Sequence, residues 1–363
     1  MQKTVLIFVC LILLALLALS CGKKTTEPDQ VATPTFDPPA GTYTAEQSVT
    51  INCATSGAEI RYTMDGSPPT STSTLYTAPI VVAASATLKA KAFKDGWDPS
   101  PTASAAFIIF ALPDDMVLVQ GGTFNNGYFN VTLSSFHISK FEVTQAEYEA
   151  VMGVNPSWFA GLADHPVENL SWFNLIEYCN RRSVMEGLTP CYSYMNYGTD
   201  TSTWPANWQE ELLYPPYSHH ENIACDWNAN GYRLPTEMEW EFAARGGNLT
   251  HGYTYSGSND IDEVAWYDEN SGSTTHAVGS KAPNELGLYD MSGNVIEMLW
   301  DIHDGYVLED QTDPHGPDYG NGRSGRGGSW DYFGVGTEVT FRYNFMPFQP
   351  SYNRGFRLAL NAP

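Results

Sequence analysis

Three stretches in the second half of the chain decide the fold: Gly231-Tyr-Arg-Leu-Pro-Thr-Glu-Met-Glu-Trp-Glu-Phe-Ala-Ala-Arg-Gly-Gly247, Gly287-Leu-Tyr-Asp-Met-Ser-Gly-Asn-Val-Ile-Glu297, and Arg326-Gly-Gly-Ser-Trp330 followed by Gly355-Phe-Arg357. The first holds the capping box Thr236-Glu-Met-Glu239, which predicts a helix ending at Gly246-Gly247. Further upstream, the capping box Thr144-Gln-Ala-Glu147 predicts a helix that ends at Gly153, and Ser171 is expected to cap one that ends at Gly187. The rest of this region is rich in Gly, Asn and Tyr, which is typical of loops.

Together, the three stretches resemble the formylglycine-generating enzyme, or sulfatase-modifying factor, family. The resemblance implies an α+β C-type-lectin-like domain over residues 111–363. Active members carry two cysteines just after Arg-Gly-Gly-Ser, whose thiolates hold Cu(I) and drive the oxidation of a sulfatase cysteine. Here Tyr332 falls at the position of the first of them, and no cysteine follows Cys225. Because Cu(I) prefers thiolate ligands, no copper is expected, and the family's known chemistry is in doubt.

The N-terminus has the features of an export signal. Lys3 precedes an apolar run from Val5 to Leu19, which is shorter than the roughly 20 residues that a membrane-spanning helix needs. The run ends at Ala18-Leu-Ser-Cys21, which resembles the lipobox of bacterial lipoproteins, although an ordinary cleavage site fits the same residues. We therefore expect a signal peptide at 1–20, lipidation of Cys21 and a polar tether over 21–33, with the mature protein anchored to the bacterial cell envelope through lipid alone.

Residues 34–110 are expected to form a small all-β domain. Val49 and Ile51 alternate with polar residues, as do Leu88 and Ala90, which is the pattern of half-buried strands. The run from Ile60 to Thr70 resembles the C-terminal, Ig-like sandwich module of chitobiases and hexosaminidases. In that family the module is an accessory domain without catalytic residues.

The loop Asp290-Met-Ser-Gly-Asn-Val-Ile-Glu297 offers two carboxylates and several backbone carbonyls within eight residues. Hard oxygen ligands at this density suit Ca²⁺. The family resemblance places a structural calcium at Asp290, Gly293, Val295 and Glu297. The alternative is a tight turn whose carboxylates accept backbone amides.

The cysteines allow a disulfide in the second domain. Cys191 and Cys225 bracket an aromatic-rich insertion, residues 192–224, in an exported domain, so a disulfide between them is expected. A copper-thiolate pair built from these cysteines is the alternative. Cys179 lies in the middle of a predicted helix on its apolar side, where burial is expected.

The C-terminal stretch is crowded with aromatic residues, which is typical of a recognition surface. The resemblance places this stretch on the exposed ligand face of the fold. Tyr332, Phe333, Phe345 and Tyr352 are the predicted ligand-binding residues, whereas Trp330, Phe341 and Phe356 are expected in the core.

Charge limits the choice of partner. The chain has a formal net charge of −23, and residues 111–363, with 11 basic and 33 acidic side chains, hold most of it. Such a surface argues against nucleic acid. The sequence therefore favours an exported lipoprotein whose second domain binds an extracellular or periplasmic glycan or protein without catalysis. An oxidoreductase that uses O₂ on a protein cysteine or other substrate, and a purely structural envelope protein, are the alternatives.

Overall fold

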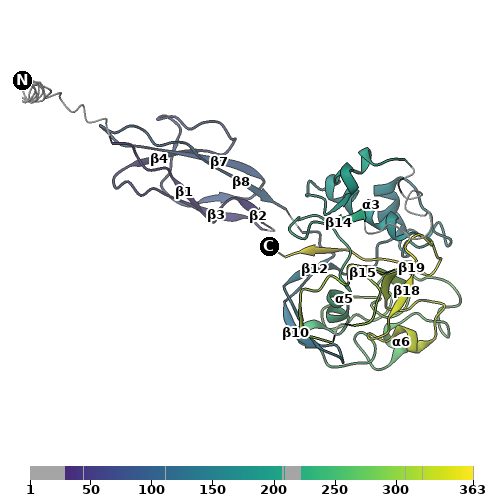
Figure 1. Cartoon of the computed structure of the whole chain (residues 1–363). Helices are drawn as coiled ribbons and strands as arrows, with labels where there is room; N and C mark the ends of the chain where they lie inside the picture. The colour runs from purple at the N-terminus through teal and green to yellow at the C-terminus, as the bar shows by residue number, and fades with distance from the viewer. Residues whose placement is uncertain are drawn as a thin grey trace, which may run out of the picture. The chain divides into compact units, whose positions relative to one another are not determined.

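The computed structural model describes residues 29–362, apart from 44, 111, 207, 209–221, 307 and 321. The predicted signal peptide, Cys21 and the tether up to residue 28 lie outside the described residues. The chain divides into two compact units, Met1–Ala111 and Leu112–Pro363 (Figure 1). Within the described part of the chain, no helix is long and apolar enough to cross a membrane.

The first unit contains two β-sheets. One has the strand order β1-β3-β6 and the other the order β2-β8-β7-β4-β5. The strands are β1 (Thr35–Asp37), β2 (Gly41–Tyr43), β3 (Gln47–Asn52), β4 (Glu59–Thr63), β5 (Thr74–Leu75), β6 (Ile80–Val82), β7 (Ala86–Phe93) and β8 (Ala103–Ile109).

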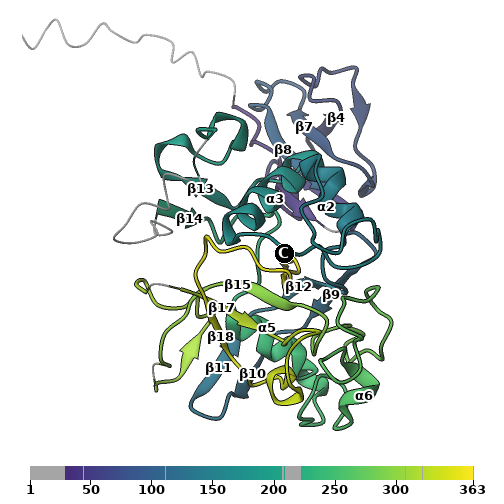
Figure 2. The ribbon, with the colours of Figure 1, turned by 90° about the vertical axis from the view of Figure 1, so that its right-hand side faces the viewer.

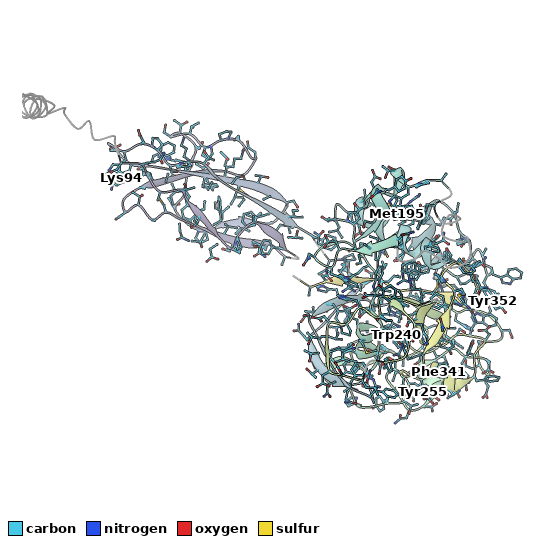
Figure 3. All side chains as sticks on the ribbon, in the orientation of Figure 1. Lys94, Met195, Trp240, Tyr255, Phe341 and Tyr352 are labelled. Atoms are coloured by element: carbon cyan, nitrogen blue, oxygen red, sulfur yellow. The ribbon has the colours of Figure 1, made fainter. Side chains whose placement is uncertain are left out.

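The interior of the first unit follows the alternation in its sequence. Val49 and Ile51 of β3 and Leu88 and Ala90 of β7 are buried, and they share one apolar cluster with Phe107 of β8. The predicted strand patterns are therefore confirmed. On the outside, the ammonium of Lys94, labelled in Figure 3, lies 4.4 Å from the ring centroid of Trp97.

The second unit combines short strands with a few helices and much loop (Figure 2). Its sheets have the orders β20-β12-β9, β10-β11-β16, β13-β14 and β18-β17-β15-β19. The strands are β9 (Met116–Val119), β10 (Gly122–Asn125), β11 (Asn130–Leu133), β12 (Phe136–Ser139), β13 (Tyr192–Tyr194), β14 (Ile223–Cys225), β15 (Ile296–Ile302), β16 (Gln311–Thr312), β17 (Arg323–Arg326), β18 (Tyr343–Phe345), β19 (Arg354–Gly355) and β20 (Ala359–Asn361). The helices are α2 (Gln145–Met152), α3 (Trp172–Met185), α5 (Glu237–Ala244) and α6 (Ile261–Val264).

The three predicted helices begin where their capping residues indicate. Thr144 and Thr236 form complete capping boxes at α2 and α5, and Ser171 caps α3 with Asn174 as its partner. Gly153 ends α2 in the left-handed conformation, which glycine adopts without steric cost.

Helix α5 is central to the second unit. Trp240, Phe242 and Ala243 belong to an apolar cluster that also includes strand residues such as Val119 and Ile138. The helix contacts β15 and β17, and all eight of its residues are buried. The sequence predicts an apolar face for this helix, but its acidic residues are buried as well, and they position the site described next.

Candidate functional site

The signature residues form a buried ionic scaffold. Arg326, at the end of β17, donates from Nε to Glu237 at 2.9 Å and from Nη2 to Glu241 at 2.7 Å. Both acids come from α5, and all three side chains are at most 3 % exposed. Buried charges need partners of this kind, because an unpaired charge in the interior costs several kcal/mol.

A second buried pair joins the second signature stretch to the Gly-Phe-Arg end of the third. Arg357 donates from Nε and Nη2 to the two carboxylate oxygens of Glu297 at 2.7 and 2.6 Å. Both side chains are 0 % exposed. The indole Nε1 of Trp240 donates to the same carboxylate at 2.7 Å. Helix α5, strand β15 and the Gly-Phe-Arg segment therefore meet at Glu297.

The loop from Asp290 to Glu297 is fixed by backbone contacts. Asp290 and Asn294 have φ angles of 57° and 62°, and Gly293 has one of 83°. A Cβ at Gly293 would lie 2.3 Å from the carbonyl oxygen of Trp266, so only glycine fits there. The amide of Gly293 donates to the carbonyl of Gly327, which ties this loop to the Arg-Gly-Gly-Ser turn.

The predicted calcium ligands are close in the chain, and the carboxylates of Asp290 and Glu297 already accept hydrogen bonds. The carboxylate of Asp290 accepts the amide of Gly279 at 2.7 Å, and burial raises its pKa to about 6. Burial, together with the nearby carboxylates of Asp290 and Glu297, raises the pKa of Glu142 well above its usual range. Glu142 accepts the amide of Val295 at 3.1 Å.

This geometry fits an ion pair at Glu297 better than a calcium ion. A cation bound by Glu297 would share the carboxylate with the guanidinium of Arg357, which carries the same sign of charge. Among the described residues, no group of three or more His, Cys, Asp or Glu side chains is placed to hold a metal ion. Calcium binding at Asp290, Gly293, Val295 and Glu297, which would rest on two carboxylates and two backbone carbonyls, stays a prediction.

The predicted disulfide is not formed. Cys191 and Cys225 are both free thiols, as are the other described cysteines, Cys53 and Cys179. In the β13–β14 ladder Cys225 pairs with Tyr192. Because neighbouring side chains alternate between the faces of a sheet, Cys225 shares a face with Tyr192 and not with Cys191. The Cys191 thiol contacts the carbonyl of Gly231 instead, at 3.1 Å.

The C-terminal stretch does present aromatic rings to solvent. Tyr332, Phe333 and Tyr352 are 37, 73 and 47 % exposed. We define the aromatic surface as Tyr332, Phe333, Phe341 and Tyr352; Phe341 and Tyr352 are labelled in Figure 3.

Buried rings support the aromatic surface from below. Tyr343 lies 4.9 Å from Tyr332 and 5.0 Å from Phe341 between ring centroids. Trp330 lies 5.8 Å from Tyr352 and donates from Nε1 to its carbonyl. The exposed rings are therefore held by packing against buried neighbours and not by their own contacts alone.

Two assignments in this stretch are wrong. Phe345, predicted to bind ligand, is 5 % exposed, because β18 turns both Tyr343 and Phe345 inward and Asn344 outward. Phe341, predicted in the core, precedes the strand and is 37 % exposed. Trp330 and Phe356 are buried as predicted.

Arg354 adds a positive charge near the aromatic surface. Its guanidinium lies 5.1 Å from the ring centroid of Phe345 and donates to the carbonyl of Gln349. Burial lowers its pKa from the usual value for arginine. The sequence carried no local signal for this residue, which lies just before the Gly-Phe-Arg motif.

A further acid that sequence reasoning missed is Asp301 of β15. It is 3 % exposed and accepts the amide of Glu237, at the N-terminus of α5, at 2.8 Å. Burial, and then the charge of Glu237, raises the pKa of Asp301 to about 8.

This pKa predicts a pH-dependent stability. Between about pH 4 and pH 8 the folded state holds the Asp301 proton while the unfolded state has lost it, so unfolding releases a proton and stability falls as the pH rises. The slope from this group is about −1.4 kcal/mol per pH unit. Asp301→Asn, which resembles the protonated acid, should remove that slope. Urea unfolding of both proteins from pH 4 to pH 8 measures it, and parallel curves would contradict the assignment.

A loop-rich α+β unit whose signature segments are locked together by buried Arg–Glu pairs defines a domain of the formylglycine-generating type. The family described as the sulfatase-modifying factor enzyme 1-like domain matches residues 110–362, and the chain belongs to this family. The family described as the chitobiase/beta-hexosaminidase C-terminal domain matches residues 38–104.

Individual relatives cover most of the second unit. The chain is 41% identical over 245 residues to the chaperone protein LppX of Paenibacillus barcinonensis, over 60% of this chain and 79% of that protein. It is 28% identical over 285 residues to the formylglycine-generating enzyme of Streptomyces coelicolor, over 67% of this chain and 86% of the enzyme. Treponema denticola variable protein 1 has a similar structure, with a TM-score of 0.59, 34% identity, and coverage of 72% of this chain and 96% of its own. The predicted families and fold class, an Ig-like sandwich followed by a C-type-lectin-like domain, are confirmed.

Proposed function

We propose that this protein is an exported, lipid-anchored bacterial protein whose second domain binds a ligand through the aromatic surface and does not catalyse. The observation that carries the proposal is Tyr332. It stands where the first copper cysteine of the active enzymes would be, and its ring is 37 % exposed beside Phe333, which is 73 % exposed. A surface of exposed rings over a packed base suits recognition.

The ligand we propose is another exported protein. The relative named chaperone protein LppX, 41% identical, supports this class, since a chaperone acts on proteins. Arg354 supplies a positive charge that could meet a carboxylate of the partner. A glycan is the alternative ligand.

The experiment that identifies the partner is photo-crosslinking in the envelope of living cells. A photo-reactive phenylalanine in place of Phe333 should give a discrete crosslinked protein, and the same group in place of Tyr197, which is exposed on the 3₁₀ turn Met195–Tyr197, should not. No protein crosslink at position 333, together with binding to an array of defined oligosaccharides that Phe333→Ala abolishes, would establish the glycan alternative. If neither ligand class binds, the purely structural role gains support.

Formylglycine synthesis is not expected. The reaction of the active enzymes needs two thiolates on one copper, and the chain has no cysteine beyond Cys225. The purified protein should hold no stoichiometric copper by elemental analysis and should leave the cysteine of a sulfatase-motif peptide unchanged by mass spectrometry. Oxygen-dependent turnover of that peptide would instead establish the oxidoreductase alternative.

Lipidation at Cys21 is testable on its own. The apolar run that ends at a lipobox-like site predicts a diacylglyceryl cysteine at the mature N-terminus. Cys21→Ser should move the protein from the membrane to the soluble fraction, and mass spectrometry of the wild type should find the modified cysteine. A wild-type N-terminus that begins with unmodified Cys21 in detergent extracts would refute the anchor.

A further inference from the structure

The second unit contains a cavity that none of the aromatic-surface residues lines. It has a volume of about 330 Å³ and lies between the N-terminus of α5, the end of β15 and the segments 304–306 and 311–317. Phe129, Met238 and Tyr306 form an apolar wall, and Asp301, Arg342 and His315 contribute polar groups. A mainly apolar cavity with a few placed polar groups is the usual form of a small-molecule site.

The buried charged side chains of this cavity already have partners, and the carboxylate of Asp304 lies at an exposed position. Arg342 donates from Nη2 to Glu237 at 2.7 Å and from Nη1 to the carbonyl of Asp304 at 2.9 Å. Glu237 also pairs with Arg326 at 2.9 Å. An anionic or cationic ligand would have to compete with these contacts, since breaking a buried pair is costly. The lining therefore favours a ligand without net charge.

One carboxyl group remains available to hydroxyl groups. One oxygen of Asp301 accepts the amide of Glu237, and the residue lines the cavity. A Cβ at Gly316, on the opposite side, would lie 2.8 Å from Asp301 Cβ, so this glycine lets the loop approach the acid. Burial raises the pKa of Asp301 to about 8, which favours the neutral acid, able both to donate and to accept a hydrogen bond.

Two aromatic rings belong to the same cavity lining as Asp301. The imidazole of His315 stacks on Trp227 with 3.6 Å between centroids and an interplanar angle of 4°. Tyr306 lies edge-on to Phe129 at 5.6 Å, and its hydroxyl accepts from Arg326 at 2.9 Å. These contacts fix the rings before any ligand arrives, which reduces the entropic cost of binding.

We propose that this cavity binds one neutral monosaccharide unit. A pyranose ring has an apolar C–H face, which suits the ring of His315, since the guanidinium of Arg342 already lies 4.0 Å from the ring centroid of Tyr306. Its rim of hydroxyl groups suits Asp301 and the backbone of the 311–317 segment. The volume is near the lower end for ligand sites, of order 300 Å³, and admits a single ring and not a chain. The ring is supplied either as a free sugar or as the end of a glycan.

The test is a binding screen with the full mature chain. The probes are neutral hexoses and N-acetylhexosamines, their β-linked disaccharides, and glucuronic acid and glucosamine as charged counterparts. Saturation-transfer NMR identifies binders, and calorimetry measures affinity. At least one neutral sugar should bind at least tenfold more tightly than its charged counterpart. If only the disaccharides bind, the site recognises the ends of glycans. If monosaccharides bind as tightly as disaccharides, the site takes free sugars.

Variants separate this cavity from other surfaces. His315→Ala removes an exposed ring face from the lining and should weaken binding at least tenfold with little change in folding. His251→Ala, whose side chain is 63 % exposed and away from the cavity lining, is the matched control and should bind as the wild type does. Pro317→Trp, which fills the cavity, should abolish binding.

No neutral sugar bound, a preference for the charged sugars, or full affinity in both cavity variants would overturn the proposal. Phe333→Ala should leave sugar binding unchanged, so the result is independent of the proposed function.

Discussion

Replacing Arg357 with methionine is expected to lower the free energy of unfolding of the second unit by about 3–5 kcal/mol, because it leaves a buried charge without its partner. Glu297 is 0 % exposed, and without Arg357 its carboxylate keeps only the indole of Trp240 as a hydrogen-bond donor among the described residues. The carboxyl groups of Glu142 and Asp290 lie close enough to add repulsion. Urea unfolding followed by tryptophan fluorescence measures the loss.

The matched control makes the same substitution on the surface. Arg181 pairs with Glu177 one helical turn away, but its side chain is 40 % exposed, and such pairs contribute about 0–1 kcal/mol. Arg181→Met should therefore be nearly neutral. Adding Glu297→Gln to Arg357→Met should recover part of the loss, since it removes the unpaired charge. Similar losses of unfolding free energy for Arg357→Met and Arg181→Met would show that the buried pair stabilises the fold no more than the exposed pair does.

The same unfolding series tests the calcium prediction. If a calcium ion were held by Asp290, Gly293, Val295 and Glu297, chelation would lower the melting temperature of the wild type by mass action. A wild-type melting temperature that chelation leaves unchanged would refute the calcium prediction and leave Arg357, 2.6 Å away, as the partner of the Glu297 carboxylate. Unfolding the Arg357→Met variant with and without chelator also shows whether a metal cation takes the place of the missing guanidinium.

Local signals in the sequence were sufficient for the helix boundaries. A capping box is contained within four residues, so Thr144 and Thr236 identify the starts of α2 and α5 without knowledge of the fold. The alternation of β3 and β7 is equally local. The C-type-lectin-like fold itself followed only from the resemblance, because most of the second unit is loop without periodicity.

The ionic scaffold could not be predicted in the same way. Glu237 and Glu241, four residues apart, look like the polar face of a surface helix, and Glu239 looks like a further surface acid, yet all three are buried. The partners of Glu237 and Glu241 lie far away in the sequence: Arg326 follows them by 89 and 85 residues. The available signal was indirect, since the three signature stretches each combine charged residues with glycines. Only the fold shows which charges meet.

The errors at the aromatic surface have a similar origin. A three-residue strand fixes which side chains point inward, and the sequence does not show where that strand begins. Because β18 starts at Tyr343, Phe345 is buried, whereas Phe341 lies outside the strand and is exposed. The cysteines show the same limit: one step in the β13–β14 register decides whether Cys225 faces Cys191.

Removing Phe333 and Tyr352 together is expected to weaken binding of the crosslinked partner by about 2 kcal/mol or more, roughly 30-fold, if the aromatic surface contains a hot spot. Both rings are more exposed than Tyr332, at 73 and 47 %, so their loss removes contact area without opening the core. Phe345→Ala is unsuitable for this test, because that side chain is 5 % exposed and its truncation would leave a cavity.

The control variant distinguishes recognition from general loss of aromatic surface. Tyr197 is 45 % exposed and lies in the insertion, away from the C-terminal stretch, so Tyr197→Ala should leave the affinity unchanged. Biolayer interferometry with the partner identified at position 333 measures each variant, and unfolding curves confirm that Phe333→Ala and Tyr352→Ala remain folded. Unaltered affinity in the double variant would refute the aromatic surface as the binding site. A loss of affinity confined to the Phe333/Tyr352 double variant would mean that the aromatic surface is used for recognition. That surface includes Tyr332, which stands at the position of the first copper cysteine.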